Sequence, residues 1–183
     1  MNERLNRRQF LSMNWDATVG FVGNLVLSQL DDEREFFRPP GASTEVEFLT
    51  LCTRCGLCKN ACPEETISLF SLASGAKLAN TPFIDPNIRP CTMCGKCIDV
   101  CPSHALTTIA NGGSAVVGFA DILPDNCLAF KDVMCDYCIR ACPQTQAIYL
   151  DNGKPVVIAE NCNGCGLCVS RCISVDKGIW IKL

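Results

Sequence analysis

Short β-prone stretches alternate with turn signals over most of the chain. The clearest pair, residues 147–150 and 155–158, lies on either side of Asn152-Gly153. Asn-Gly between two such stretches is a strong hairpin signal, so we predict a hairpin there. The same pattern predicts two further pairs across longer or glycine-rich connections: residues 66–70 with 81–85, and residues 105–109 with 115–120. This self-similarity indicates an internal repeat.

Residues 1–45 follow a different pattern, which ends at Pro39-Pro40-Gly41. Between residues 9 and 30 the only charged residue is Asp16, which is suited to cap a helix. We expect that helix to run to about Phe37 and to stop before the prolines. Its apolar positions 19, 22, 26 and 30 share one face, and other apolar residues widen that face. A helix this apolar needs burial on more than one side.

Such a helix can be buried in two ways. It can pack over the rest of its own chain, or it can dock onto another subunit. We favour docking, either to a catalytic partner or to a second copy of this chain through residues 9–37. Residues 1–45 are therefore interpreted as an N-terminal helical docking arm.

The N-terminal region also bears on localisation. No stretch of 18 residues lacks polar interruption, so we expect no membrane span. Residues 6–11, Asn-Arg-Arg-Gln-Phe-Leu, are similar to a twin-arginine export signal. However, Asp16 interrupts the apolar region behind this motif, and no Ala-x-Ala cleavage site follows. We therefore expect a cytoplasmic protein, with export to the periplasm as the alternative.

Composition excludes one class of partner and favours one class of chemistry. Charged residues make up 19% of the chain and the net charge is −3, so no basic footprint indicates nucleic acid. Cysteine is the outlier, with 16 in 183 residues. So many cysteines indicate either a disulfide scaffold or a metal-binding one, and their spacing decides between the two.

The cysteines fall into four runs of four, with none left over. Three runs have the spacing C-x2-C-x2-C-x3-C, and the third run has C-x7-C-x2-C-x3-C. Proline follows the last cysteine in the first three runs, whereas Ile173 follows it in the fourth. In chain order the runs are Cys52, Cys55, Cys58 and Cys62; Cys91, Cys94, Cys97 and Cys101; Cys127, Cys135, Cys138 and Cys142; and Cys162, Cys165, Cys168 and Cys172.

This spacing is typical of iron–sulfur ligation. Three cysteines on one tight loop can point three thiolates at three corners of a cubane, and in two-cluster ferredoxins the fourth cysteine ligates the other cluster. Glycines inside the loops (Gly56, Gly95 and Gly166) let the backbone turn N–H groups towards sulfur. Cysteines two residues apart pair poorly as disulfides, and zinc sites use separated C-x2-C pairs. The C-x3-C-x2-C spacing of radical-SAM enzymes is absent. The sequence therefore predicts four [4Fe–4S] clusters with all sixteen cysteines as ligands.

Two pairings of the runs are open. Tandem pairing joins run one with run two and run three with run four, each fourth cysteine completing its neighbour's site. The alternative joins run one with four and run two with three. The 19-residue gap between runs three and four, with its predicted hairpin, favours tandem pairing. Tandem pairing gives the ligand sets Cys52, Cys55, Cys58 with Cys101; Cys91, Cys94, Cys97 with Cys62; Cys127, Cys135, Cys138 with Cys172; and Cys162, Cys165, Cys168 with Cys142.

With these runs, residues 45–183 resemble a bacterial-type ferredoxin duplicated into a polyferredoxin. The resemblance implies an α+β fold in which short antiparallel strands and small helices surround each pair of clusters. It implies one ferredoxin-like unit over residues 46–120 and a second over residues 121–183. The stretched first gap of run three and Ile173 after run four depart from the family pattern.

Two groups of four-cluster proteins share this layout. The stretched third run resembles that of the ferredoxin subunits associated with nitrate reduction and methylamine use, which are exported. The layout also resembles the small polyferredoxin subunit of tungsten-dependent aldehyde oxidoreductase complexes, which is not exported. We favour the second resemblance, and with it a cytoplasmic relay in anaerobic metabolism, since such clusters are sensitive to oxygen and need reduced thiols.

Little else in the chain can carry chemistry. The single histidine, His104, is expected in a surface or capping role, and no phosphate loop or dinucleotide motif is present. Asp136 in run three would disfavour reduction of a nearby cluster, whereas run two holds Lys96.

We therefore expect no catalysis by the chain itself. The prediction is an electron-transfer subunit that connects a catalytic oxidoreductase subunit, such as a tungsten or molybdenum aldehyde oxidoreductase, to an acceptor subunit. The alternatives are an exported ferredoxin of a nitrate-reductase-type quinol pathway, a free-standing polyferredoxin, and a structural metal or disulfide protein with no redox role.

Overall fold

Six short strands pair into three two-stranded antiparallel sheets in the computed structural model, which describes residues 34–109 and 115–183. The strands are β1 (Ile67–Leu69) with β2 (Pro82–Ile84), β3 (Phe119–Ile122) with β6 (Ile179–Lys182), and β4 (Ile148–Asp151) with β5 (Lys154–Val157). The helices are α2 (Glu45–Leu51), α3 (Leu57–Ala61), α4 (Lys96–Asp99), α5 (Tyr137–Ala141) and α6 (Leu167–Arg171), with 3-10 turns η1 (Leu72–Ser74), η3 (Leu128–Lys131) and η4 (Ala159–Asn161).

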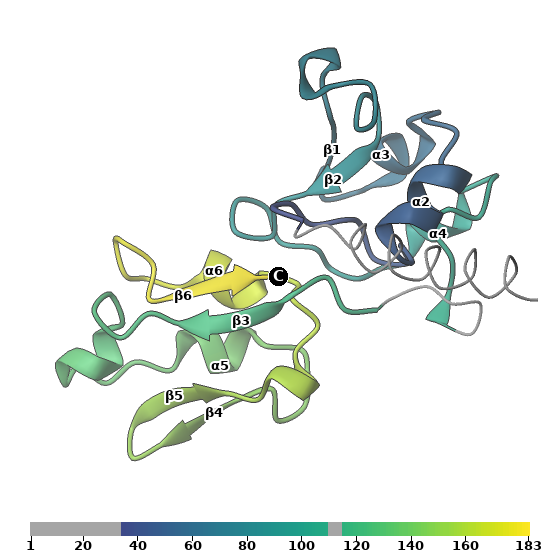
Figure 1. Cartoon of the computed structure of the whole chain (residues 1–183). Coiled ribbons are helices and arrows are strands. Elements are labelled where there is room, and N and C mark those ends of the chain that lie inside the picture. Colours follow the sequence, from purple (N-terminus) through teal and green to yellow (C-terminus); the bar gives the residue numbers. More distant parts are fainter. Residues whose placement is uncertain (1–33, 110–114) are drawn as a thin grey trace, which may run out of the picture. The chain divides into compact units, whose positions relative to one another are not determined.

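The described chain repeats one plan twice. In each half a hairpin lies between the two cysteine runs: β1–β2 in the first half and β4–β5 in the second. In each half the segment before the first run also pairs with the segment after the second run. That closure is a single bridge between Ala42 and Leu106 in the first half, and the full β3–β6 sheet in the second, where β3 lies beside β6 (Figure 1). The predicted fold of short antiparallel strands and small helices in two ferredoxin-like units is therefore confirmed.

One predicted hairpin is wrong. Residues 105–109 and 115–120 do not pair with each other: Leu106 bridges to Ala42, and β3 pairs with the last strand of the chain. The register sets Ala120 opposite Ile181, and both are buried in the core of the second half. β3 thus closes the second repeat instead of the first, because its buried residues complete that core.

The segment that precedes the first run packs onto the first half. Arg34 to Phe37 are not helical, so the prediction that a helix extends to Phe37 is wrong for these four residues. Phe37 instead forms an isolated bridge with Ile84, whose N–H donates a 2.9 Å hydrogen bond to the carbonyl oxygen of Phe37. The rest of the predicted helix, and most of the predicted arm, lies outside the described residues.

A buried arginine fixes this segment. Arg38 is 3% exposed and binds the carboxylate of Glu45 with Nε and Nη2, at 2.9 and 2.5 Å. Its Nη1 donates to the hydroxyl of Thr81 and to the carbonyl oxygen of Pro82, at 2.9 and 2.6 Å. The guanidinium also stacks over the ring of Phe48, 4.5 Å from its centroid. These contacts tie the segment before α2 to the β1–β2 hairpin.

Each half has its own small hydrophobic core, and cysteines are part of both. Phe48, Ile84 and Leu106 are the largest buried side chains of the first core, which also holds Cys58 and Cys97. The second core holds Val169, Ile179 and Ile181 together with Cys162 and Cys168. Phe37 packs against both cores. Apolar burial this limited leaves room for bound groups to contribute to stability.

Candidate metal centres

In runs one, two and four the first two cysteines lie on a tight loop, and the third lies in the short helix that follows. In run one the loop turns through two left-handed residues, Arg54 with φ 58° and Gly56 with φ 74°. Runs two and four have left-handed residues at the same two positions. In run three Asp136 occupies the second of these two positions and is not left-handed, since its φ is −135°. Cys127, the first cysteine of the run, directly precedes the 3-10 turn η3. The stretched gap of run three thus replaces a loop with a turn of helix.

The short helices carry the third and fourth cysteines of their runs. In α3, Cys58 lies in the first turn and Cys62 caps the C-terminus, and α5 and α6 repeat this arrangement. Four residues of helix span about 6 Å. The two sulfurs therefore leave opposite ends of the helix and enter different sites.

The structure groups the cysteines into four sets of four. Each of the first three sets, those of sites I, II and III, lines one cavity. In the fourth set, burial raises the pKa of the Cys165 thiol, and the nearby charges of Cys142 and Cys162 add to the increase. We name them site I (Cys52, Cys55, Cys58, Cys101), site II (Cys62, Cys91, Cys94, Cys97), site III (Cys127, Cys135, Cys138, Cys172) and site IV (Cys142, Cys162, Cys165, Cys168). This grouping is that of tandem pairing.

The surroundings of these sites suit an anionic, sulfur-ligated group. Backbone N–H groups point at sulfur: Leu106 donates to Cys101 at 3.5 Å, Ala120 to Cys162 at 3.4 Å and Gly178 to Cys172 at 3.3 Å. Such bonds stabilise thiolates and tune cluster potentials. A single-ion site is a different arrangement, and no three His, Cys, Asp or Glu side chains of residues 34–109 and 115–183 form one. Four cysteine sulfurs that face one cavity are the donor set that a [4Fe–4S] cluster needs.

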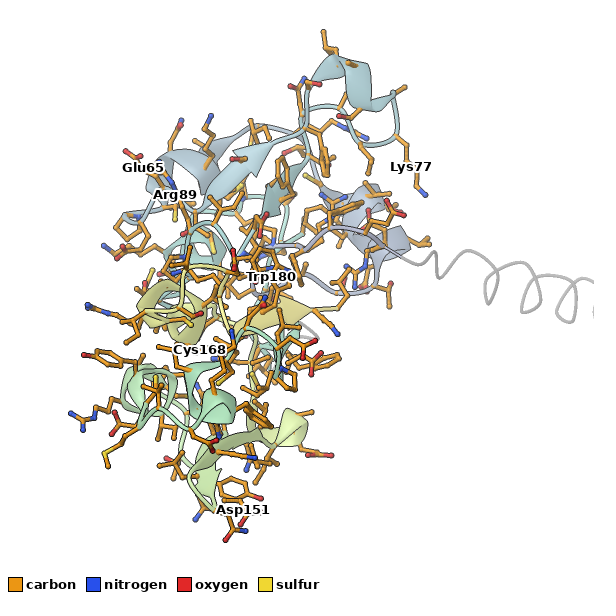
Figure 2. All side chains as sticks on the ribbon, turned by 90° about the vertical axis from the view of Figure 1, so that its left-hand side faces the viewer. Glu65, Lys77, Arg89, Asp151, Cys168 and Trp180 are labelled. Atoms are coloured by element: carbon orange, nitrogen blue, oxygen red, sulfur yellow. The ribbon has the colours of Figure 1, made fainter. Side chains whose placement is uncertain are left out.

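The protein alone disfavours ionisation of the innermost thiols. Burial is the first cause that raises the pKa of Cys58 and Cys138 to about 11, and that of Cys97 and Cys168 to about 12. Neighbouring cysteine charges raise these pKa values further, because like charges facing one cavity repel. Cys168 is 5% exposed, and Figure 2 places it midway along the described chain, whereas Asp151 lies at its lower end. A positively charged iron core supplies the compensation that four facing thiolates need.

One set of site-shaping residues has only a weak sequence signal. After the fourth cysteine of every run, one left-handed residue reverses the chain and a small or short residue follows it. These left-handed residues are Glu65, His104, Gln146 and Lys177. His104 is exposed and has φ 55°, so its place is a backbone turn at the surface. The predicted capping or surface role of the histidine agrees with this position.

The charge predicted to act on site III is partly neutralised. Asp136 accepts a 2.8 Å hydrogen bond from Nε of Arg140, one helical turn further on, and Nη2 of Arg140 lies 2.7 Å from the same carboxylate oxygen. The sequence places both residues in run three, but only the structure shows that they pair. Asp136 therefore presents less negative charge to the site than the sequence alone suggests.

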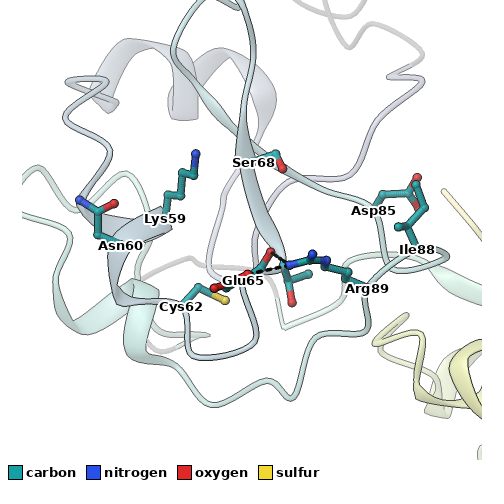
Figure 3. A pocket seen from close by; sticks show the side chains of 9 residues that line it. Lys59, Asn60, Cys62, Glu65, Ser68, Asp85, Ile88 and Arg89 are labelled. Carbon is teal, nitrogen blue, oxygen red and sulfur yellow. Dashed lines mark hydrogen bonds and ion pairs between the residues drawn. The ribbon is translucent and has the colours of Figure 1, made fainter.

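A further hollow on the described surface lies open to solvent. It has a volume of about 660 Å³ and is lined by one cysteine, Cys62. Figure 3 shows its central feature, the 3.0 Å ion pair between Glu65 and Arg89, with Lys59 of α3 nearby. Lys59 and Asp85 also line this hollow, and the ion pair between Glu65 and Arg89 is exposed to solvent.

Comparison with known proteins covers both halves. Residues 51–105 match a family model described as a 4Fe-4S dicluster domain, and residues 119–173 match a second model with the same description. The chain is 41% identical over 158 residues to the ferredoxin-type protein NapG of Escherichia coli, which covers 78% of this chain and 68% of that protein. It is 38% identical over 154 residues to the methylamine utilization ferredoxin-type protein MauM of Methylorubrum extorquens, covering 77% of this chain and 70% of that protein. It is also 33% identical to the ferredoxin-type protein NapF of Escherichia coli, over 74% of this chain and 79% of that protein.

Proposed function

Because the chain belongs to the 4Fe–4S dicluster ferredoxins related to the ferredoxin-type proteins NapG and MauM, we propose that it relays single electrons through sites I to IV, each holding one cluster. Two dicluster domains with sixteen cysteines correspond to four [4Fe–4S] clusters. The chain is thus an electron-transfer protein and not an enzyme. All sixteen cysteines are the proposed ligands.

The observation that carries this proposal is the grouping of the cysteines. Three cavities are each lined by four cysteines, three from one run and one from its neighbour. A bound cluster supplies the one-electron redox chemistry. The residues of the chain hold it by thiolate, shield it from water, and direct N–H groups at sulfur.

A relay needs partners at both ends. We propose that the chain works between a catalytic oxidoreductase subunit and an electron acceptor. The names of its relatives, NapG, MauM and NapF, favour the nitrate and methylamine group of ferredoxins. They give no support to the predicted resemblance to tungsten-dependent aldehyde oxidoreductase complexes. We therefore propose a partner of the kind that serves the nitrate and methylamine group.

The arm is proposed as the docking element. Residues 1–33, which contain most of its apolar stripe, lie outside the described residues. The test is a truncation that removes residues 1–33 and keeps Arg34, whose guanidinium lies 3.7 Å from Glu45. Removal of residues 1–37 would also delete Phe37 from both cores and confuse loss of docking with loss of stability. A truncated chain that elutes with the full-length assembly on a sizing column would refute docking through the arm.

The N-terminal region also allows a test of whether the protein is cytoplasmic or periplasmic. The cytoplasmic location remains our prediction, and the resemblance to NapG and MauM supports export as the alternative. The twin-arginine-like residues 6–11 also lie outside the described residues. No helix in the described part of the chain is long and apolar enough to cross a membrane. Periplasmic recovery of the intact chain, abolished by replacing Arg7 and Arg8 with lysine, would decide for export.

Anaerobic purification tests the central proposal. A brown protein with about sixteen irons per chain and an equal amount of acid-labile sulfide is expected, with an EPR signal after reduction by dithionite. A colourless chain containing zinc, or one with disulfides in place of metal, would refute it. Variants of single cysteines that keep the full iron content would remove those cysteines from the ligand set.

A further inference from the structure

We propose that the four sites form one linear path in the order I–II–IV–III, so that site IV lies inside the path and sites I and III are its ends. This order rests on the proposed function. It differs from the order of the cysteine runs along the chain, in which site III would precede site IV.

Within each half, adjacency follows from the short helices. Cys58 of site I and Cys62 of site II belong to α3, four residues apart. The reciprocal link is made by α4 and the residue after its cap, which place Cys97 in site II and Cys101 in site I. Two helices thus join site I to site II, each spanning about 6 Å. α5 and α6 join site III to site IV in the same way.

Between the halves, the link runs from site II to site IV. The backbone N–H of Cys91, in site II, donates to the carbonyl oxygen of Cys165, in site IV, at 2.7 Å. Asn87 anchors the same junction with two hydrogen bonds to the backbone of Ile181, at 2.7 and 3.0 Å. The peptide groups of two ligand residues are therefore in direct contact. This is the shortest covalent and hydrogen-bonded route that the described contacts provide between the cysteines of the two halves.

In sites I and III, the backbone N–H groups of the ligand residues Cys101 and Cys127 form hydrogen bonds within their own halves. The N–H of Cys101 donates to Ile98, and that of Cys127 donates to Leu123, at 3.1 and 2.9 Å. Site IV is the most enclosed, since its Cys162, Cys165 and Cys168 are all at most 8% exposed. This burial supports an inner place for site IV. Site II, whose Cys94 is exposed, is placed inside the path by its contacts alone.

Each step along this path transfers one electron between neighbouring clusters. The donor cluster is oxidised by one electron and its neighbour is reduced by one, with the partner proteins as the external donor and acceptor. No bond is made or broken. Tunnelling through protein slows steeply with distance, so electrons follow the sequence of nearest neighbours.

The fully reduced holoprotein tests the order, because neighbouring reduced clusters broaden each other's EPR signals. Serine variants would remove one cluster at a time, through Cys55 for site I, Cys94 for site II, Cys135 for site III and Cys142 for site IV. Loss of cluster I should sharpen only the signal of cluster II, and loss of cluster III only that of cluster IV. Loss of cluster II should sharpen the EPR signals of clusters I and IV together. A direct magnetic interaction between clusters II and III that survives the loss of cluster IV would overturn the order.

A glycine pair gives a matched test of the junction. Gly166 and Gly95 occupy the same position in their loops, with φ of 79° and 76°. A Cβ added at Gly166 would collide with the carbonyl oxygen of Pro86, whereas one added at Gly95 meets nothing within 4 Å. Gly166→Ala and Gly95→Ala therefore carry equal backbone strain, and only the first pushes the loop of site IV away from site II.

Gly166→Ala should lose the interaction between clusters II and IV while keeping those within each half, and Gly95→Ala should keep all of them. Equal spectra of the two variants would overturn the assignment of the junction. If Gly166→Ala fails to assemble, the serine series still decides the order. The iron content distinguishes failure of the proposed function from failure of the proposed order. A protein with fewer than four clusters refutes the proposed function, whereas a four-cluster protein with another pattern of interactions refutes only the order.

Discussion

Replacement of Arg38 by methionine should destabilise the holoprotein far more than the same replacement of Arg89. Each arginine forms one ion pair with a glutamate, but in opposite environments. The side chains of Arg38 and Glu45 are 2% and 5% exposed, whereas those of Arg89 and Glu65 are 56% and 81% exposed. Methionine keeps much of the apolar volume of arginine in both cases, so the two variants differ mainly in what happens to the charge left behind.

The expected magnitude follows from that difference. Loss of one partner of a buried ion pair costs about 3–5 kcal/mol, because the other charge stays buried without compensation. Arg38→Met also leaves Thr81 and Pro82 without their donor. Arg34 remains 3.7 Å from Glu45 and can compensate in part, which favours the lower end of that range. For the exposed pair, the cost should be about 0–1 kcal/mol.

The assay is the rate at which the visible absorbance of the clusters is lost in denaturant. Cluster loss makes unfolding irreversible, so a rate is the appropriate measure of stability. If the buried pair is broken in the transition state, about 3 kcal/mol corresponds to roughly a hundredfold faster loss, at about 1.4 kcal/mol for each factor of ten. Arg89→Met should stay within about fivefold of the unmodified protein.

A second substitution separates lost charge from lost packing. Addition of Glu45→Leu to Arg38→Met removes the uncompensated carboxylate, and replacement of both members of a buried pair by apolar residues is often neutral. The double variant should therefore lose its clusters more slowly than Arg38→Met alone. Equal rates for Arg38→Met and Arg89→Met, or a double variant less stable than Arg38→Met, would refute the reasoning.

Three single contacts give further tests. Cys62→Ser should remove the same EPR component as variants of the other cysteines of site II, because tandem grouping places it there; pairing of run one with run four would remove a different one. Arg140→Ala should lower the midpoint potential of the site III cluster in an EPR-monitored titration, and Asp136→Asn should raise it, since the ion pair now offsets the carboxylate charge; equal potentials would contradict this. Gly178→Ala places a Cβ 2.6 Å from the Cα of the first cysteine of site III and should lower the iron content by about four per chain. Gly75→Ala, whose Cβ meets nothing within 4 Å, should retain full iron.

The local parts of this structure are predictable from sequence because their determinants are adjacent in the chain. The β4–β5 hairpin forms where Asn152-Gly153 separates two β-prone stretches, and both residues adopt the positive φ angles that such a turn needs. The cysteine loops follow for the same reason, since three ligands within seven residues fix the course of the backbone. The grouping of the fourth cysteines followed from the length of the connection between runs.

The non-local parts were not predictable in the same way. β3 looks like the partner of residues 105–109 because they are close in sequence, yet it pairs with β6 some 60 residues later. Nothing in the local pattern of either strand specifies the other, and the shared burial of their apolar faces decides the pairing. The role of Arg38 was missed for a related reason. A single arginine beside two prolines resembles a surface charge until Glu45 and the ring of Phe48 are found around it.

The junction between the halves does have a sequence signal, and its physical cause explains why one run differs from the others. At the left-handed position before the second cysteine, runs one and two have full side chains, Arg54 and Met93, whereas run four has Gly164. A Cβ at Gly164 would collide with the backbone of Gly118, which precedes β3, and Gly166 two residues later faces Pro86 from the other half. The loop of run four is thus covered by backbone on two sides, which the exposed loops of runs one and two are not. An Asn-Gly-Cys-Gly sequence within a cluster-binding run therefore marks the loop that lies inside the protein, and in a polyferredoxin that loop is where the path between the dicluster units should be sought.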